Sequence, residues 1–341
     1  MIEAIRDPQR YPGADMLPPA ERRTAVSVVM PVLNERRHLR EAVARVLEQD
    51  LDGDLELVLA LGPSTDGTDA VAADLAAEDP RIRLVRNPTG RTPSALNAAV
   101  AASTHSVIAR VDGHAVLPPG YLRTALAVLA QTGADNVGGI MDAQGVTDVE
   151  RAIAAAMRSR LGVGSARFHT GGEAGPAETV YLGVFRRTAL ARVGGYDEHF
   201  ARAQDWEMNH RIRSTGGTVW FTPELRVTYR PRADLKALAR QYFQYGRWRR
   251  VVARRHAGTM SARYLAPPTL VAALAISLAV SPWLPVALMV PAGYAGALVL
   301  GSLALEPGLP WRSKAVLPAV LAVMHLSWGI GFVTSRVQEP A

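Results

Sequence analysis

Two long stretches without charged side chains restrict the folding of this 341-residue chain more than any other feature. Leu265–Leu305 contains 41 residues and Ala315–Ser335 contains 21, and neither includes Asp, Glu, Lys or Arg. The first stretch is about twice the ~20 residues that a helix needs to cross a bilayer, and Ser281–Pro285 divides it at a turn. A buried helical hairpin in a water-soluble protein is the alternative, but such length without charge favours about three transmembrane helices. The predicted spans are roughly residues 265–281, 284–305 and 315–335.

A basic segment directly precedes the first apolar stretch. Arg226 to Arg263 contains eleven Arg or Lys residues and one acid, Asp234, which gives +10 in a chain whose net charge is +7. Such a patch can bind nucleic acid, but cations beside a span stay on the cytoplasmic side and attract anionic lipid headgroups. Apolar residues recur every three to four positions from Asp234 to about His256, which predicts an amphipathic interface helix. We therefore expect membrane lipids, and no nucleic acid, as partners of residues 226–264.

Charge and composition also predict topology. The chain has no cysteine, which excludes disulfides and thiolate metal sites. Residues 1–23 form a polar extension without the pattern of a cleavable signal. Arg312 and Lys314 place the loop Glu306–Lys314 on the cytoplasmic side together with the basic segment. We expect a multi-pass plasma-membrane protein with a cytoplasmic N-terminal portion and with Arg336–Ala341 outside.

The part of the chain before the basic segment alternates short apolar runs with helical patterns. The predicted strands are Ala25–Met30, Leu55–Leu61, Ile82–Val85 and Val107–Val111, with helices between them and a further helix at Val149–Leu161. This alternation predicts βαβ units and a parallel sheet, which binds ligands at the carboxyl ends of its strands.

Polar residues follow the first two predicted strands. Asn34 and Glu35 come after the first strand, where the simplest interpretation is a helix cap and a charge that complements the helix dipole. Ser64 and Asp66 follow the second strand, where an ordinary turn is sufficient. Neither loop indicates a function when it is taken alone.

The fourth strand is followed by Asp112-Gly113-His114, which places a carboxylate and an imidazole at the rim of the sheet. A diphosphate needs a counter-charge, and Mg²⁺ or Mn²⁺ held by one or two side chains supplies it. The carboxylate suits either ion, whereas the imidazole favours Mn²⁺. The alternative is a capping Asp beside an incidental His.

A further candidate, Asp205, lies in Gln204-Asp205-Trp206-Glu207, just before a predicted helix. A carboxylate at a helix start can remove the proton of an attacking hydroxyl, and it can equally be a cap.

The ordered series of motifs indicates more than any one of them. PVLNE, STDGT, DGH, GGYDE, QDWE and Gln244-Tyr245-Gly246-Arg247-Trp248 follow one another from about Val26 to Trp248. This series resembles family 2 glycosyltransferases with the GT-A fold, and is most similar to the bacterial exopolysaccharide group that includes a succinoglycan-biosynthesis transferase. The resemblance implies an α/β nucleotide-diphospho-sugar transferase domain over residues 24–225, with a mainly parallel sheet flanked by helices and with transmembrane helices after it.

The resemblance also implies roles at matching positions. Asp205 matches the catalytic base, Asp112 and His114 match the metal-holding triplet, and the group of Gln244, Arg247 and Trp248 matches a signature that contacts the diphosphate and the acceptor. The residues implied in donor binding are Pro31, Asn34, Glu35, Ser64, Asp66 and Asp112. Two positions depart from the family pattern. The stretch Ala60–Pro63, directly before Ser64, contains no acid, which weakens the expectation of a uridine donor. Gln204 stands where the family usually has a Glu.

The sequence therefore predicts an inverting transferase that uses Mn²⁺ or Mg²⁺ and a nucleotide-diphospho-sugar, with UDP-hexose expected. A lipid-linked sugar or a polysaccharide is the expected acceptor at the cytoplasmic membrane face, where envelope-biosynthesis proteins are further candidate partners. A processive polysaccharide synthase and a non-catalytic nucleotide-sugar-binding membrane adaptor are the alternatives. A nicotinamide-dependent oxidoreductase is disfavoured because no GxGxxG follows the first strand.

Overall fold

A computed structural model of the chain describes residues 25–336. The predicted extension at residues 1–23 lies outside this range. The described chain divides into two compact units: residues 25–141 with 171–228, and residues 142–170 with 229–336. The division falls within two strands, β5 (Asn136–Ala143) and β8 (Val219–Tyr229).

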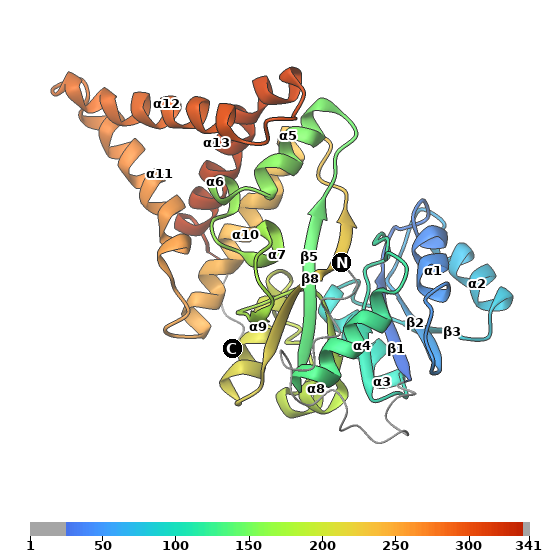
Figure 1. The fold of residues 1–341 in the computed structure, drawn as a ribbon. Helices are drawn as coiled ribbons and strands as arrows, with labels where there is room; N and C mark the ends of the chain where they lie inside the picture. The colour runs from blue at the N-terminus through green and yellow to red at the C-terminus, as the bar shows by residue number, and fades with distance from the viewer. Residues whose placement is uncertain (1–24, 337–341) are drawn as a thin grey trace. The chain divides into compact units, whose positions relative to one another are not determined.

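The first unit is built on four parallel strands in the order β3-β2-β1-β4 (Figure 1). Their bounds are β1 Val26–Val32, β2 Leu55–Leu61, β3 Ile82–Arg86 and β4 Val107–Arg110. Helices α1 (Leu39–Leu47), α2 (Thr68–Glu78) and α3 (Thr92–Ala102) connect them. The strands β1, β2 and β4 are near-continuous apolar runs because both faces of the sheet are covered there, whereas β3 at the edge carries two arginines. The parallel strands and helices predicted from the sequence are thus confirmed, with shifts of a few residues at their ends.

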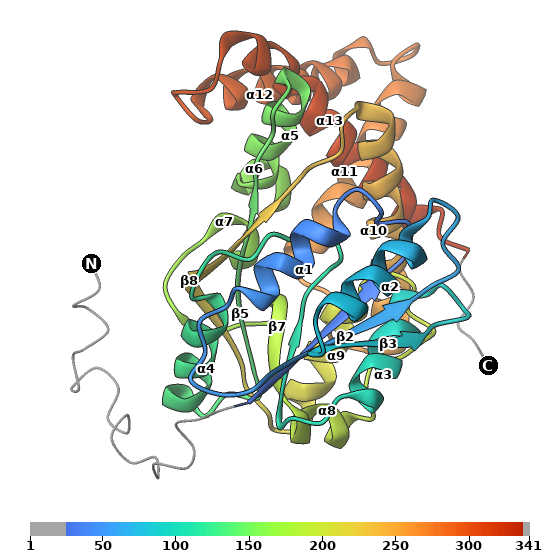
Figure 2. The same ribbon diagram turned by 90° about the vertical axis from the view of Figure 1, so that its right-hand side faces the viewer.

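Alternate residues of β1 pack into two separate cores. Val28 and Met30 face α1, α2 and α4 (Tyr121–Thr132), whereas Val29 faces α3, α8 (Arg187–Val193) and α9 (Gln204–Ser214). Figure 2 shows α1 and α2 on the near side of β1–β3. This period of two residues fixes which residues of the strand point to each layer.

Antiparallel strands extend the sheet beyond β4. β7 (Tyr181–Arg186) pairs antiparallel with both β4 and β5, and the short β6 (Gly175–Pro176) pairs with β8 at the far edge. The sequence interpretation did not include β5 or β8. Two adjacent glycines interrupt the apolar run of β5, and Gly139 lies so close to Leu225 that a methyl group there would overlap the carbonyl oxygen of that residue.

The second unit is helical. Its elements are α5 Asp148–Met157, α6 Arg160–Val163, α7 Arg167–Thr170, α10 Leu235–Arg255, α11 Ala262–Val280, the 3₁₀ helix η3 Pro285–Leu288, α12 Met289–Ala304 and α13 Trp311–Val333. A capping box between Thr147 and Glu150 starts α5. The single helix predicted at Val149–Leu161 is wrong in one respect: it breaks at Ser159, whose side chain accepts from the Gly162 N–H and starts α6. The predicted interface helix matches α10, which Asp234 caps.

Helix α13 lies at the centre of this unit. Glycines let it approach α10 closely, because side chains at Gly246 or Gly331 would meet the backbone of the facing helix. Near its first turn, the Ser313 hydroxyl donates to Asp148 of α5 (2.9 Å). Residues 142–170 fall inside the segment 24–225 predicted as catalytic, yet they pack with the C-terminal helices. The domain boundaries stay a prediction.

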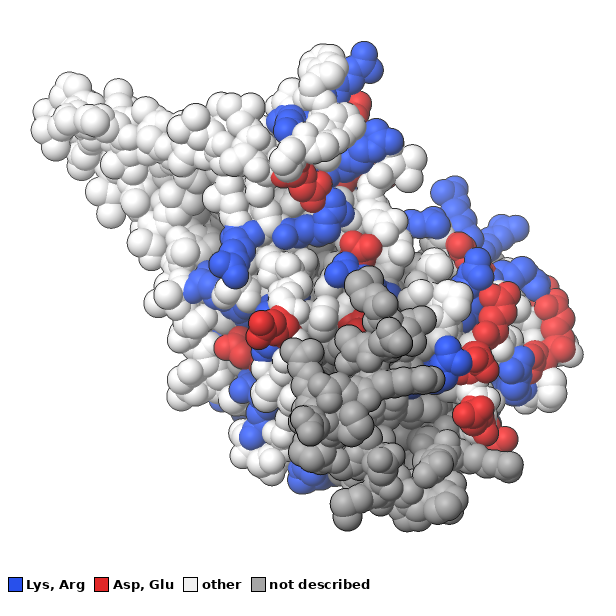
Figure 3. All heavy atoms as spheres, viewed as in Figure 1, with Lys and Arg blue, Asp and Glu red and all other residues white. Residues whose placement is uncertain are grey.

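Within residues 25–336, three helical segments are long and apolar enough to cross a membrane: Ala262–Val280, Pro285–Ala304 and Trp311–Val333. They coincide with the three predicted spans. Large apolar side chains on the first two are exposed, among them Ile276 at 64%, Met289 at 70% and Leu300 at 69%. The corresponding surface of α11 and α12 in Figure 3 carries no charged side chain on the face shown. An apolar surface of this extent indicates contact with lipid.

The close approach at Gly139 predicts a stability effect. Gly139→Ala should lower the free energy of unfolding by about 1–3 kcal/mol because the added methyl group overlaps backbone on β8. Thermal unfolding of the detergent-solubilised full chain, followed by circular dichroism, measures the change. Gly293→Ala in α12 is the matched control because a methyl group there meets open space. Equal melting temperatures of the two variants would contradict the packing described.

Candidate active site

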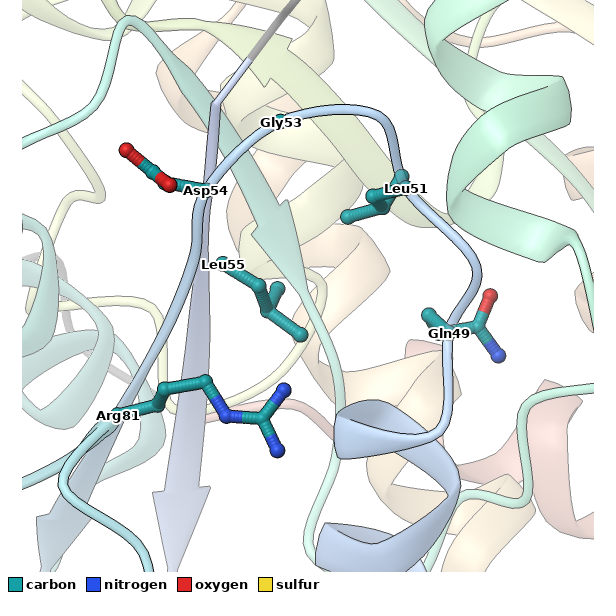
Figure 4. A pocket seen from close by; sticks show the side chains of 6 residues that line it. All are labelled: Gln49, Leu51, Gly53, Asp54, Leu55 and Arg81. Carbon is teal, nitrogen blue, oxygen red and sulfur yellow. The ribbon is translucent and has the colours of Figure 1, made fainter.

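The candidate site residues of the first unit gather at the carboxyl ends of β1, β2 and β4. A surface hollow of about 430 Å³ lies at the opposite, amino ends of β2 and β3, where Leu55 and Arg81 line it (Figure 4). Ligands of parallel sheets bind at the carboxyl ends, so this hollow is not the expected donor site. Gln49, on its wall, already donates to the carbonyl of Pro118 (2.9 Å) and accepts from the Leu122 N–H (3.0 Å).

The loops after β1 and β2 are joined by hydrogen bonds. The Asn34 N–H donates to Ser64 Oγ (3.1 Å), and Asn34 Oδ1 accepts from the Thr65 N–H (2.9 Å). Asn34 has the left-handed φ of 56°, which asparagine tolerates better than most residues. The predicted capping role is wrong, because the residue that precedes α1 is His38. Asn34 instead fixes the two loops to each other.

Asp66 organises the start of α2. Its carboxylate accepts from the Thr68 hydroxyl (2.5 Å), the Thr68 N–H (3.0 Å) and the Arg36 N–H (3.2 Å). These hydrogen bonds, the Thr68 hydroxyl first, lower the pKa of Asp66 below its ordinary value. The carboxylate is thus held by its own turn and by the first loop.

The loop after β1 also contacts the loop after β4. Glu35 Oε1 lies 2.7 Å from His114 Nδ1, and the Glu35 side chain is only 18% exposed. Gly113 permits this contact, because a Cβ there would lie 3.1 Å from Glu35 Cγ and 3.5 Å from the carbonyl oxygen of Pro31 in β1. Glu35 therefore orients the imidazole, a role that the sequence interpretation, which predicted a helix-dipole or nucleotide contact, did not include.

Arg110 at the end of β4 joins Asp112 to Asp205. Its Nε and Nη2 donate to Asp112 Oδ1 at 3.1 and 3.0 Å, and its Nη1 donates to Asp205 Oδ1. Asp205 lies in the first turn of α9 rather than before it, since the helix begins at Gln204. Ala203, just before, has the left-handed φ of 62° and directs the chain into this turn.

Burial and neighbouring charges act on the pKa values of Asp205 and Arg110. Burial raises the pKa of Asp205 above its ordinary value, Asp112 adds to the rise, and Arg110 opposes it. The Asp205 side chain keeps 41% of its accessible surface, so water moderates this shift. Burial disfavours the charge on Arg110, but the two acids outweigh it and raise the pKa of Arg110 well above its ordinary value.

The GGYDE and QDWE motifs position this cluster. Asn97 of α3 holds Tyr196 by two backbone hydrogen bonds of 2.8 Å, and the buried Tyr196 side chain lies beside Arg110. Glu207 pairs with Arg211 at 2.7 Å within α9, and Arg211 also donates to the carbonyl of Gly195 (2.8 Å). The helix that begins with QDWE is thereby bonded to the GGYDE segment, a contact that the motifs taken singly do not predict.

The three remaining candidates lie in the second unit, on α10. Gln244, Arg247 and Trp248 have the spacing i, i+3, i+4, so they share one face of the helix. The Arg247 guanidinium lies 5.8 Å from the ring centre of Phe243 on the same helix. Their predicted contacts with the diphosphate and the acceptor stay a prediction.

Asp112 and His114 form a donor set that suits a divalent cation. Arg110 donates to Oδ1 of Asp112, and Glu35 lies against Nδ1 of His114, so both side chains are held in place. A carboxylate and an imidazole would be the donors that this pair offers to a cation. Within residues 25–336 there is no cluster of three or more His, Cys, Asp or Glu side chains that could hold a metal. A cation here would therefore complete its shell with phosphate oxygens and water, as Mg²⁺ commonly does.

This arrangement defines a class of protein. A mixed sheet with side chains suited to a divalent cation and a separate carboxylate at its carboxyl edge is the arrangement expected of a GT-A nucleotide-diphospho-sugar transferase. The family model "Glycosyl transferase family 2" matches residues 27–194. The succinoglycan biosynthesis protein ExoA of Rhizobium meliloti is 34% identical over 316 residues, which cover 91% of this chain and 94% of that protein. The chain belongs to glycosyltransferase family 2, in its exopolysaccharide group, and is a glycosyltransferase.

Solved structures agree with the fold. The mannosyltransferase PcManGT from Pyrobaculum calidifontis, in complex with GDP-Man and Mn²⁺, is 23% identical with a TM-score of 0.58, covering 92% of this chain and 89% of its own. Residues 1–349 of S. aureus TarS, in complex with UDP-GlcNAc, are 14% identical with a TM-score of 0.50, covering 91% of each chain. The predicted GT-A fold is confirmed.

The Glu35–His114 contact predicts a defect in Mn²⁺-dependent donor binding. Glu35→Gln should weaken it about 10–100-fold, because the amide can present its NH₂ to Nδ1 and no longer fixes the imidazole tautomer. Binding of nucleotide sugars to the full chain with and without Mn²⁺, by calorimetry, measures this. Glu78→Gln, which removes only a surface pair with Arg40, is the control. Equal Mn²⁺ dependence in both variants would show that Glu35 does not support His114.

Proposed function

We propose that this glycosyltransferase moves a sugar from a nucleotide-diphospho-sugar to a lipid-linked or polysaccharide acceptor, with inversion, at the cytoplasmic face of the membrane. The observation that carries the proposal is the convergence of Asp112, His114 and Asp205 at one edge of the sheet, with Asp112 and Asp205 joined through Arg110. The donors named for the two solved relatives, GDP-Man and UDP-GlcNAc, support the donor class. UDP-hexose is the donor that we propose to test first.

The reaction is a single displacement. Asp205 accepts the proton of the acceptor hydroxyl as its oxygen attacks the anomeric carbon of the donor sugar. The bond between that carbon and the diphosphate oxygen breaks on the opposite face, and the nucleoside diphosphate leaves with the electron pair. A divalent cation, when bound, supplies positive charge to the leaving diphosphate. Asp112 and His114 would hold it, and Pro31, Asn34, Glu35, Ser64 and Asp66 shape the loops around the donor.

The second unit supports a membrane-bound acceptor. Three apolar helices follow α10, which carries Gln244, Arg247 and Trp248 together with much of the basic charge. We propose that α10 lies in the interface of the cytoplasmic leaflet, where its cations attract anionic headgroups, and that the three helices cross the bilayer. Envelope-biosynthesis proteins are the protein partners we would seek there. A ladder of products, rather than one added sugar, would instead support the processive synthase.

Asp205→Asn should lower transfer by at least ~10²-fold while donor binding is kept, because the amide cannot accept the hydroxyl proton. The full chain is purified with Mn²⁺, screened against nucleotide sugars with membrane lipid extract as acceptor, and assayed by product mass. Asp69→Asn is the matched control, since Asp69 is also a first-turn acid but lies exposed on α2. Normal turnover by Asp205→Asn would refute the base assignment.

The raised pKa of Asp205 predicts a pH dependence. Only the deprotonated carboxylate can act as base, so kcat should rise as pH increases through a pKa that lies above the ordinary value of 3.8. Initial rates at saturating donor and constant Mn²⁺ across the acid range would reveal this limb. A kcat that stays constant down to about pH 4 would exclude a base with a raised pKa.

A further inference from the structure

The guanidinium of Arg110 is a buried cation placed between two acids of the active site. Its side chain is 7% exposed, although it stands at the end of an apolar strand. One edge, Nε and Nη2, faces Oδ1 of Asp112, whereas Nη1 faces Oδ1 of Asp205, 95 positions away in the sequence. A planar guanidinium with five N–H donors can bind two carboxylates in fixed directions at once.

Without this cation the two carboxylates would face each other's charge in a partly enclosed site. Released from Arg110, both carboxylates would be able to move towards a cation held by the imidazole of His114, and carboxylate and imidazole are ligands that Mn²⁺ accepts. A carboxylate that coordinates a divalent cation is a poor base, because the cation competes with the proton for the same lone pairs. The chemistry therefore needs Asp112 and Asp205 to stay in separate roles.

We propose that Arg110 is a positioning residue that keeps Asp205 out of the coordination sphere of the cation, so that Asp112 binds the cation and Asp205 remains the base. The inference rests on the proposed function for the roles of the two acids. The fixed positive charge of Arg110 holds one oxygen of each acid and thereby prevents both acids from binding one metal ion.

A purely structural role predicts a different pattern of contacts. Arg187, a half-buried arginine of the same unit, donates to the carbonyls of His105 (2.7 Å) and Val100 (3.1 Å) and to the Ser103 hydroxyl (2.8 Å). Such contacts fasten loops and helix ends. Arg110 instead donates to the two acids. The two arginines therefore provide a test variant and a matched control.

The test is Mn²⁺ binding by the full chain without donor, followed by the electron paramagnetic resonance of free Mn²⁺. Arg110→Met should bind Mn²⁺ at least ~10-fold more tightly than the parent chain, because a positive charge is removed and Asp205 becomes available as a ligand. Arg110→Met with Asp205→Asn should lose most of this gain. Arg187→Met should bind Mn²⁺ as the parent does.

Kinetics give a second, independent measurement. Arg110→Met should lower kcat by about 10²-fold with a smaller change in donor KM, because the base is misplaced while the donor loops remain. Arg110→Lys keeps the charge but not the hold on both acids, so its Mn²⁺ affinity should lie between those of the parent and Arg110→Met. Its single ammonium cannot hold both acids in the same directions, so its kcat should still fall.

Asp205→Asn alone keeps the proposal testable if Arg110→Met fails to fold. With Arg110 in place this variant should bind Mn²⁺ within a few-fold of the parent, since only a nearby charge is lost. A loss of ~10-fold or more would overturn the proposal by showing that Asp205 is a ligand. Unchanged Mn²⁺ affinity in a folded Arg110→Met would also overturn it. If no nucleotide sugar is transferred but the Mn²⁺ pattern is as expected, the proposed function fails and the separation of the two acids by Arg110 stands.

Discussion

The parallel pairing of β1 with β2 and β4 is the constraint on which the site depends. Because the three strands run in one direction, the loops that follow them emerge at the same edge of the sheet, and residues 30 to 80 positions apart become neighbours. Asn34 then bonds to the second loop and Glu35 to the fourth. The loop after β1 is therefore joined to both the loop after β2 and the loop after β4. In the loop after β4, Gly113 lies against Pro31 and Glu35, so a larger side chain at this position would require movement.

The sequence predicted the parallel strands β1 to β4 well because each of them is marked by its own residues. Apolar runs such as VIAR mark buried strands, and a polar residue directly after a strand must lie at its carboxyl end. The strands β5 and β8 were missed because neighbouring strands determine their residues. Gly139 of β5 accommodates Leu225 of β8, whereas Gly138 accommodates Val180 and Tyr181. Pro223 interrupts the pattern of β8. Contacts such as Glu35–His114 are likewise unpredictable from spacing, since they depend on how separate loops fold together. Arg110 did leave a signal, a lone cation that ends an apolar strand, which burial rarely tolerates without partners.

In the second unit, packing by small residues replaces the alternation of a sheet. Gly246 and Gly331 let α10 and α13 meet at their backbones, and Gly329 does the same for α13 against α11. Close approach of this kind stabilises helices where apolar surface alone gives no preference for protein over lipid. Polar contacts add direction, as between Arg158 and Glu306 at 2.7 Å. Hydropathy predicted which helices are apolar, but not that α13 is central and that α11 and α12 expose most of their surface.

The Gln at position 204, where the family usually has a Glu, can be considered together with the charges around Arg110. Gln204 is 9% exposed and directly precedes Asp205 in α9, so an acid there would add a buried negative charge beside that carboxylate in the sequence. One guanidinium already serves two carboxylates, and a further buried charge without its own partner costs several kcal/mol, on the order of the whole stability margin of a domain. A neutral amide at this position keeps the charge of Arg110 for the two acids whose roles differ. The departure from the family pattern is therefore compatible with the proposed role of Asp205 as base.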